Sequence, residues 1–299
     1  MKQKVLVAGG TGFIGFHVLK SFNPKKYVLH SLSTKYPEKK RKVKNVKYLI
    51  CDITKKSNLN KKIFINYDHV INLSGYIDHS KKIKTIKSHY NGLKNLVNFF
   101  KKKKIKTFMQ IGSCLEYGNI KSPQRESNYS KPRNYYAFAK SNASKYLVKA
   151  GLNFDIPYII LRLYQVYGPN QKFDRLIPFV INSCLNDKKF PCTNGLQVRD
   201  FLYVEDLVRL IRIIIQKRER KLIFNVGSGN PIKVKSVIKN ISKYIKKGKP
   251  NFNAIKMRKD EIKSLYPDIK LVKKKLDWKP KVSLKKGLKK TISFYNAIQ

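Results

Sequence analysis

The sequence has few acidic residues. Its 299 residues include 17 aspartates and glutamates against 66 lysines and arginines, which gives a formal net charge of +49 at neutral pH. A surplus of this kind can serve nucleic-acid binding, because basic side chains displace the counterions of the phosphate backbone. Here the lysines are spread along the whole chain beside plentiful Asn, Ile, Tyr and Phe, a composition typical of AT-rich coding. We therefore interpret the charge as solvated surface and expect no specific nucleic-acid partner, although a positive field attracts small polyanionic substrates.

Paired cysteines and long apolar runs are also missing. The four cysteines, Cys51, Cys114, Cys184 and Cys192, form no C-x-x-C pair, which argues against a zinc ribbon, a redox pair or a disulfide framework. We expect no metal site, and unpaired thiols fit a reducing, cytoplasmic location. No stretch approaches ~18 uninterrupted apolar residues, and the apolar run at the N-terminus is too short for a signal peptide, so we expect no membrane insertion.

The chain does contain enough apolar material for a large core, with 42% hydrophobic residues. Short apolar runs alternate with amphipathic stretches of helix length, which predicts βαβ units and a doubly wound parallel sheet of the Rossmann type. After about residue 165, helices alternate with irregular Gly, Pro and Asn segments. We predict an α/β fold with an NAD(P)-binding Rossmann domain over 1–165 and a smaller substrate lobe over 166–299, some of whose elements return to the sheet. The expected strands are 4–8, 27–33, 46–50, 69–73, 107–111 and 158–163, and the expected helices are 14–22, 83–104, 176–185, 205–216, 234–245 and 284–295.

A glycine-rich turn follows the first expected strand. Gly9, Gly12 and Gly15 stand in the sequence GGTGFIG, which opens the first expected helix. A dinucleotide site needs such glycines, because the backbone must turn sharply, approach a pyrophosphate without a Cβ in the way, and let the helix pack closely on the sheet. The pyrophosphate then lies at the helix N-terminus. The turn therefore predicts dinucleotide binding.

The segment after the second expected strand carries no early carboxylate. NAD sites usually place one there on the adenosine ribose, but residues 30–35 read HSLSTK and the first acid is Glu38. The hydroxyl of Ser33 and the charge of Lys35 suit a 2′-phosphate better, so we predict an NAD(P) site that prefers NADP(H). The alternative is that Lys35 is incidental in a lysine-rich chain. Asp52, after the third expected strand, is placed either to reach the adenine edge or to cap a turn.

Tyr136 and Lys140 are four residues apart and therefore share one helix face. A phenol with a pKa near ~10 is a poor base at neutral pH, but a neighbouring ammonium stabilises the phenolate. Tyr136 is then able to exchange a proton with a substrate oxygen while hydride moves at the adjacent carbon. Ser113 follows an apolar run and is expected at a strand's carboxyl end, where doubly wound sheets bind ligands.

Further motifs follow in a specific order. They are CDI (51–53), NLSG (72–75), Asn91-Gly92-x-x-Asn95-Leu96, GSCLEYG (112–118), Pro132, LRLYQVYGP (161–169), VRDFLYVEDL (198–207), FNVGSG (224–229) and the tail 268–288. With these motifs the chain resembles, nearly from end to end, an extended short-chain dehydrogenase/reductase of the NAD-dependent epimerase/dehydratase family. Members of that family act on nucleotide sugars.

The resemblance implies roles for individual residues. Ser113, Tyr136 and Lys140 form the implied catalytic set. Arg199 and Arg258 resemble arginines that grip the diphosphate of a sugar nucleotide, a task suited to a guanidinium, although Arg258 alternatively reads as a plain surface arginine. Gln165 stands at a sugar-contact position where the family commonly has Asn. The implied cofactor contacts are Gly9, Gly12, Phe13, Ile14, Gly15, Ser33, Lys35, Asp52, Ile53, Leu73, Tyr136 and Lys140, and the implied assembly is a homodimer.

Departures from the family pattern narrow the expected chemistry. Members that eliminate water carry Thr-Asp-Glu where this chain has Ser113-Cys114-Leu115. Members that epimerise C3 and C5 use a cysteine at the position of Leu115 and a histidine at that of Asn170, and we expect Cys114 to lie in a strand and point to the other face. Hydride chemistry at C4 remains. Residues 176–201 look like those of deoxysugar 4-reductases of lipopolysaccharide O-antigen synthesis, so we expect reduction of a 4-keto-6-deoxysugar nucleotide. The alternatives are a 4-epimerase with tightly bound NAD and a non-catalytic nucleotide-binding module.

Overall fold

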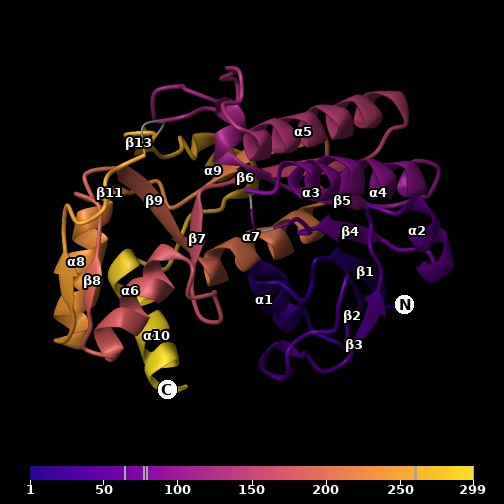
Figure 1. Ribbon diagram of the computed structural model, residues 1–299. Coiled ribbons are helices and arrows are strands. Elements are labelled where there is room, and N and C mark those ends of the chain that lie inside the picture. The colour runs from indigo at the N-terminus through magenta and orange to yellow at the C-terminus, as the bar shows by residue number, and fades with distance from the viewer. Residues whose placement is uncertain (64, 77, 79, 259–260, 299) are drawn as a thin grey trace. The chain divides into compact units, whose positions relative to one another are not determined.

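A seven-stranded sheet organises the first part of the chain (Figure 1). The structure, a computed structural model, describes residues 1–63, 65–76, 78, 80–258 and 261–298. The strand order is β10-β6-β5-β4-β1-β2-β3, and the neighbours from β6 to β3 pair in parallel. The prediction of a doubly wound Rossmann sheet is thereby confirmed. The strands are β1 (Gln3–Ala8), β2 (Tyr27–Ser33), β3 (Val46–Ile50), β4 (His69–Asn72), β5 (Thr107–Ser113), β6 (Tyr158–Leu163) and β10 (Leu222–Val226).

The order of the strands reverses between β1 and β4. From β1 the chain continues to β2 and β3 on one side, and from β4 it continues to β5 and β6 on the other. Sheets of this kind bind ligands beyond the carboxyl ends of the strands at such a reversal. The glycine turn after β1, the Leu73 segment after β4 and Ser113 at the end of β5 all lie at these carboxyl ends.

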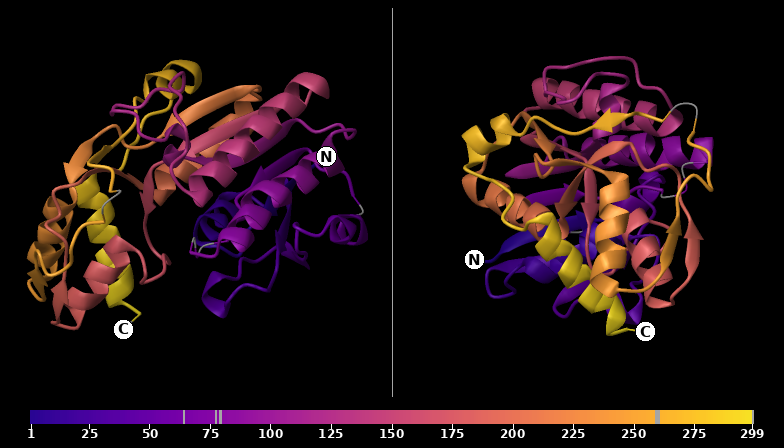
Figure 2. Two further views of the ribbon diagram at one scale, coloured as in Figure 1. Left: turned by 45° about the horizontal axis from the view of Figure 1, so that its top comes forward. Right: turned by 90° about the vertical axis from the view of Figure 1, so that its left-hand side faces the viewer.

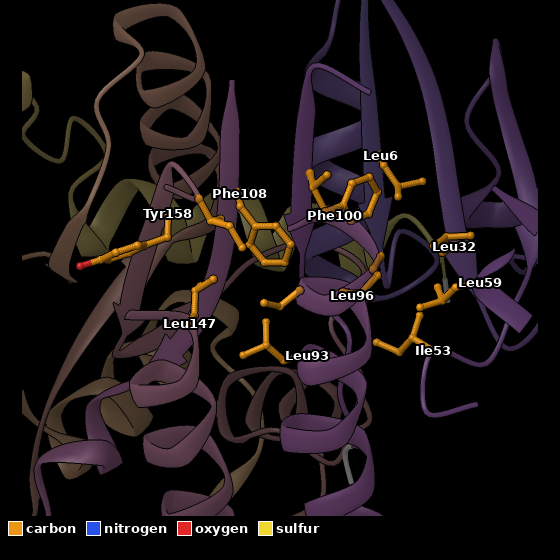
Figure 3. Packing of buried hydrophobic residues seen from close by; sticks show 14 of the residues in the cluster. Leu6, Leu32, Ile53, Leu59, Leu93, Leu96, Phe100, Phe108, Leu147 and Tyr158 are labelled. Atoms are coloured by element: carbon orange, nitrogen blue, oxygen red, sulfur yellow. The ribbon is translucent and has the colours of Figure 1, made fainter. Parts of the chain in front are cut away.

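Helices pack on the sheet through a continuous apolar cluster. Figure 3 shows Leu93, Leu96 and Phe100 of α4 directed at residues that include Phe108 of β5 and Leu147 of α5. All five side chains are fully buried, and each such burial stabilises the fold by ~1.5–3 kcal/mol. The helical segments are α1 (Phe13–Ser21), η1 (Lys39–Arg41), α2 (Lys56–Lys62), α3 (Lys82–Ile86), η2 (Lys87–Asn91), α4 (Gly92–Phe100), η3 (Cys114–Tyr117) and α5 (Tyr135–Asn153).

The single helix expected over 83–104 is wrong in two respects. It is interrupted by the π-helical turn η2, and α4 ends at Phe100 before the lysine run. A π-turn accommodates an extra residue, so the buried stripe before it is rotated relative to the stripe after it. Ile83, the first residue of the expected helix, is exposed, whereas His89 within the π-turn is buried.

The described chain divides into two compact units. The first unit comprises residues 1–120, 126–163 and 208–224, and the second comprises 121–125, 164–207 and 225–299. The division falls inside α7 (Val204–Lys217) and inside β10. In the described residues, no helix combines the length and the apolar character needed to cross a membrane.

The second unit has its own core and small sheets. Strand β9 pairs with β11, β13 and β7, while β12 pairs with β8. Helices α6, α8 and α10 pack around a second apolar cluster (Figure 2). The elements are β7 (Gln165–Tyr167), α6 (Leu176–Leu185), β8 (Lys189–Pro191), β9 (Val198–Tyr203), β11 (Pro231–Lys233), α8 (Val234–Ile245), β12 (Lys249–Asn251), β13 (Ser264–Leu265), α9 (Lys270–Leu276) and α10 (Leu284–Asn296).

Candidate active site

The glycine turn is shaped by contacts that leave no room for side chains. A Cβ on Gly15 would lie 2.3 Å from the Gly9 carbonyl oxygen, and one on Gly9, where φ is +82°, would lie 2.8 Å from the Leu73 carbonyl carbon. Gly12 is the N-cap residue of α1, and the first turn of α1 contains no carboxylate. The first N–H groups of a helix have no intrahelical partner and favour anions. The turn therefore fits a pyrophosphate at the start of α1, which Phe13 and Ile14 begin.

The end of β2 is joined to this turn. The Ser33 hydroxyl accepts a hydrogen bond from the Thr11 N–H at 3.4 Å, and its oxygen lies 3.5 Å from that of Ser31. Lys35, two residues after the end of β2, is exposed. The Glu38 carboxylate forms an exposed ion pair with the Lys40 ammonium at 3.4 Å. These contacts leave the hydroxyls of Ser31 and Ser33 and the Lys35 ammonium at the end of β2, while the Glu38 carboxylate pairs with Lys40.

Other residues expected at the cofactor site have structural contacts. The Asp52 carboxylate accepts hydrogen bonds from the backbone N–H and the hydroxyl of Thr54, at 2.9 and 2.8 Å, so it caps that turn. Ile53 is buried in the core cluster, against Gly92. Leu73 donates its N–H to the Ala8 carbonyl at 2.8 Å, which places the segment after β4 directly beside the glycine turn.

Ser113 is the last residue of β5 and the cap of η3. Its hydroxyl accepts a hydrogen bond from the Leu115 N–H at 3.2 Å, and its own N–H donates to the Glu116 carboxylate at 2.8 Å. The expectation that Cys114 lies in a strand is wrong, because β5 ends at Ser113 and the chain turns into a short helix. Cys114 is buried there as a free thiol.

Tyr136 and Lys140 lie one turn apart on α5, as their spacing predicts. The Lys140 ammonium is 5.9 Å from the centre of the Tyr136 ring and donates to the Ile111 carbonyl of β5 at 2.8 Å. Lys140 is only 4% exposed. Burial lowers the pKa of Lys140 to about 8, while the Glu116 carboxylate acts in the opposite direction. The helix is anchored at this end by Asn134, whose side chain accepts from the Ala137 N–H at 2.9 Å.

Four residues that the sequence analysis did not select lie at this end of the sheet. The His89 ring meets the Tyr136 ring edge to face at 5.1 Å and contacts the Tyr76 carbonyl at 3.1 Å. Glu116 pairs with Arg162 of β6 at 3.1 Å. Arg41 is buried in η1, after β2. The Ser113-x-x-Glu116 spacing, typical of a capping box, was the available sequence signal for Glu116. For His89 the sequence offers no such signal, because the π-turn that buries this residue has no recognisable sequence pattern.

Of the expected substrate residues, Ser113 belongs to the first unit, and Gln165, Arg199 and Arg258 belong to the second. Arg199, on β9, is buried, and its guanidinium is paired with the Glu261 carboxylate and with its own neighbour's carbonyl, that of Val198. Gln165 is exposed on β7, which pairs with β9. Arg258 is also exposed, and its carbonyl accepts from the Glu261 N–H at 3.1 Å. Glu261 thus connects Arg199 and Arg258.

The Rossmann sheet and the sequence motifs both indicate a family of dinucleotide-dependent enzymes. The profile of the NAD dependent epimerase/dehydratase family matches residues 5–227, and the chain belongs to this family. The resemblance inferred from the motifs is thereby confirmed.

Individual relatives share moderate identity with the chain. CDP-abequose synthase of Salmonella muenchen is 28% identical, with 98% of each chain covered. The dTDP-D-glucose 4,6-dehydratase of Dictyostelium discoideum is 32% identical over 80% of this chain, and the match spans 61% of that protein's length. Among solved structures, a UDP-glucose 4-epimerase of Thermotoga maritima in complex with UDP-glucose superposes with a TM-score of 0.91 at 24% identity, covering 99% of both chains. This last similarity shows the shared fold.

Proposed function

We propose that the chain is an NAD(P)-dependent oxidoreductase that reduces the C4 keto group of a 4-keto-6-deoxysugar nucleotide. The observation that carries the proposal is the buried Lys140 ammonium beside Tyr136, bonded to the backbone of the strand that ends at Ser113. The relative named CDP-abequose synthase supports it, because that match covers nearly the whole of both chains.

The first unit has the features that a dinucleotide needs. The glycine turn is a cradle that side chains would fill, and the start of α1 is free of carboxylates. Gly9, Gly12 and Gly15, with Phe13 and Ile14 at the helix start, would hold the pyrophosphate. Leu73, Tyr136 and Lys140 would line the nicotinamide half, and Ser33 and Lys35 the adenosine half, where a 2′-phosphate is favoured. A reduced nicotinamide, when bound, supplies the hydride.

Residues of the first unit would then transfer a proton to the keto oxygen of the substrate. The hydroxyls of Ser113 and Tyr136 donate hydrogen bonds to the keto oxygen and polarise the carbonyl carbon. As hydride arrives at C4, Tyr136 gives its proton to the oxygen, and the Lys140 ammonium stabilises the phenolate that remains. Solvent then reprotonates the phenolate. The same residues would run the reverse oxidation in a 4-epimerase.

Elimination of water needs an acid and a base, and neither stands at the two positions that follow Ser113. Cys114 is buried, and Leu115 is apolar. The neighbours of Ser113 therefore favour chemistry at a single carbon, even though several relatives are named dehydratases.

In the second unit, Arg199 and Arg258 are proposed to bind the diphosphate, and Gln165 the sugar. Arg199 already holds one carboxylate, that of Glu261, so its guanidinium is able to bind an anionic oxygen pair. A diphosphate would take the place of this carboxylate.

The purified protein tests the proposal directly. We expect it to emerge without bound nucleotide and to oxidise NADPH when a CDP-, dTDP- or UDP-linked 4-keto-6-deoxyglucose is added. Interconversion of UDP-glucose and UDP-galactose by protein carrying NAD through purification would replace this proposal with the 4-epimerase. Absence of any turnover, with cofactor binding intact, would favour a non-catalytic module.

A further inference from the structure

A carboxylate is buried directly behind the end of strand β5. The side chain of Glu116 has no exposed surface, and that of Arg162, its ion-pair partner, is 13% exposed. Burying a charge pair costs solvation that its mutual attraction offsets only in part. In a chain with 17 acidic residues, a fully buried glutamate at the end of the sheet where Ser113 lies calls for a role beyond stability.

Each oxygen of this carboxylate has its own donor. One accepts the backbone N–H of Ser113 at 2.8 Å, and the other accepts the Arg162 Nε at 3.1 Å. Arg162 in turn lies over the Tyr117 ring at 4.4 Å. The chain makes room for the carboxylate with Gly112, on which a Cβ would lie 2.5 Å from the Glu116 oxygen. The neighbouring residues therefore both bind the Glu116 carboxylate and leave space for it.

We infer that Glu116, held by Arg162, is a positioning residue for the reaction. Its carboxylate holds the Ser113 N–H, and the Lys140 ammonium holds the Ile111 carbonyl two residues earlier on β5, so Glu116 fixes Ser113 and is the carboxylate that acts on Lys140 beside Tyr136. The inference rests on the proposed function for its catalytic consequence. Its structural part, the charge of Lys140, is measurable without any substrate.

The charged and titratable groups joined by contacts to Glu116, Arg162 or Tyr136 come from four elements. Glu116 and Tyr117 belong to η3, Arg162 to β6, His89 to η2, and Tyr136 to α5 itself. Helices α3 and α4 place Lys82 and Lys94 on other rings of α5, those of Tyr135 and Tyr146. The negative charge among the buried groups is that of Glu116, and it raises the pKa of Lys140 against the larger effect of burial.

The charge of Glu116 is expected to extend activity toward higher pH. Lys140 stabilises the phenolate only while it is protonated. Its pKa of about 8 therefore sets an alkaline limit to activity. Removal of the Glu116 charge lowers the pKa of Lys140 further, so the alkaline limb of the kcat profile moves to lower pH.

Glu116→Gln is the direct test, because the amide keeps an oxygen for the Ser113 N–H but carries no charge. We expect the alkaline limb of kcat to move down by roughly one pH unit, with the KM values for cofactor and sugar nucleotide within about twofold of wild type. Glu205→Gln is the matched control, since Glu205 forms an exposed ion pair with Lys290; its profile should equal that of wild type. A Glu116→Gln profile that coincides with wild type overturns the inference.

Glu116→Asp tests the positioning role and guards against misfolding of the amide variant. The shorter side chain keeps the charge but draws back from the Ser113 N–H. We therefore expect an alkaline limb at the wild-type pH and a kcat about tenfold lower. An undiminished kcat, or a limb displaced as in Glu116→Gln, contradicts the inference.

A substrate-free measurement separates this inference from the proposed function. Carbon NMR of labelled lysine side chains, with Lys140 assigned by loss of its signal in Lys140→Met, gives the Lys140 titration directly. We expect it at lower pH in Glu116→Gln than in wild type or Glu205→Gln. If that shift occurs but no sugar nucleotide is turned over, the proposed function alone fails. If turnover is normal and the Lys140 titration is unchanged, the inference alone fails.

Discussion

Burial of the Lys140 ammonium lowers the stability of the folded state, but it places a positive charge beside Tyr136. Its ammonium is buried against the Ile111 carbonyl, and burial lowers its pKa to about 8. Between that value and the ordinary lysine pKa of about 10.4, the unfolded chain binds more protons than the folded one, so this group makes the folded state more stable as pH rises. The charge that is costly to bury below about pH 8 is the one that stabilises a phenolate at Tyr136.

Tyr136→Phe removes only the oxygen that moves the proton. We expect kcat to fall by ~10²–10⁴-fold, because general acid–base catalysis contributes about this much, while cofactor and substrate still bind. Tyr135→Phe is the control, since Tyr135 is exposed on the same helix and its ring meets Lys82. Steady-state kinetics with isothermal titration of both ligands provides the measurement. Near-normal turnover by Tyr136→Phe would remove Tyr136 from the mechanism.

Cofactor preference depends on the end of β2. We expect wild type to use NADPH better than NADH, because Ser33 and Lys35 favour a 2′-phosphate and the Glu38 carboxylate pairs with Lys40. Lys35→Glu should shift the ratio of kcat/KM values toward NADH by ~10-fold or more, since a carboxylate accepts from ribose hydroxyls and repels a phosphate. Lys239→Glu, at an exposed position of α8, should leave the ratio unchanged. A wild-type preference for NADH would show that Lys35 is incidental.

At the scale of residues, the sequence predicts what depends on local spacing. Tyr136 and Lys140 share a helix face wherever that helix packs, and Ser113 ends a strand because an apolar run precedes it. Glu116, Arg162 and His89 could not be found in this way, since their contacts join residues that are 13 to 46 positions apart or depend on a local π-turn. Asp52 was assigned two roles, and its bonds to Thr54 show the capping one.

At the scale of elements, alternation of apolar runs and amphipathic stretches was enough to predict the parallel sheet. Strands β2, β3 and β6 and helices α6 and α8 have the expected bounds, because burial on one or two faces sets their pattern. The expected helix over 83–104 was wrong because a strict helical period was assumed across η2. The π-turn is the element that brings His89 against Tyr136.

We expect two glycines of the turn after β1 to be needed for different reasons: Gly15 for the fold, and Gly12 for binding of the cofactor. In Gly15→Ala the new Cβ would lie 2.3 Å from the Gly9 carbonyl oxygen, so we expect a lower melting temperature and loss of cofactor binding. In Gly12→Ala the nearest atom is 3.3 Å away and φ is −76°, so the fold should survive. We expect this variant to melt within a few degrees of wild type yet bind NADPH at least ~10-fold more weakly. Unchanged NADPH affinity in Gly12→Ala would place the pyrophosphate elsewhere.

At the scale of the whole molecule, apolar side chains on the first unit point to self-association. Tyr135 and Phe138 of α5 and Ile83 of the contacting helix α3 are at least half exposed. Isolated surface apolar residues are ordinary, but a group on adjacent helices is typical of an interface. We expect a homodimer through this face.

Phe138→Glu should therefore yield monomers in size-exclusion chromatography with light scattering, because it places a charge among these exposed apolar side chains. Phe154→Glu, beyond the other end of α5, is equally exposed and should remain dimeric. A wild-type protein that is monomeric at micromolar concentration, or a Phe138→Glu variant that is still dimeric, would contradict this assignment of the interface.

In the proposed reaction, hydride reaches C4 of a nucleotide-linked sugar. The most direct measurement supplies the protein with a 4-keto-6-deoxysugar nucleotide and NADPH that carries deuterium at the transferring position, and locates the label in the product by NMR. We expect one deuterium, at C4 of the sugar, in wild type, and at least ~10²-fold less label in the same time with Tyr136→Phe. Deuterium at another carbon, or a product formed without label from the added NADPH, would contradict the proposed reaction.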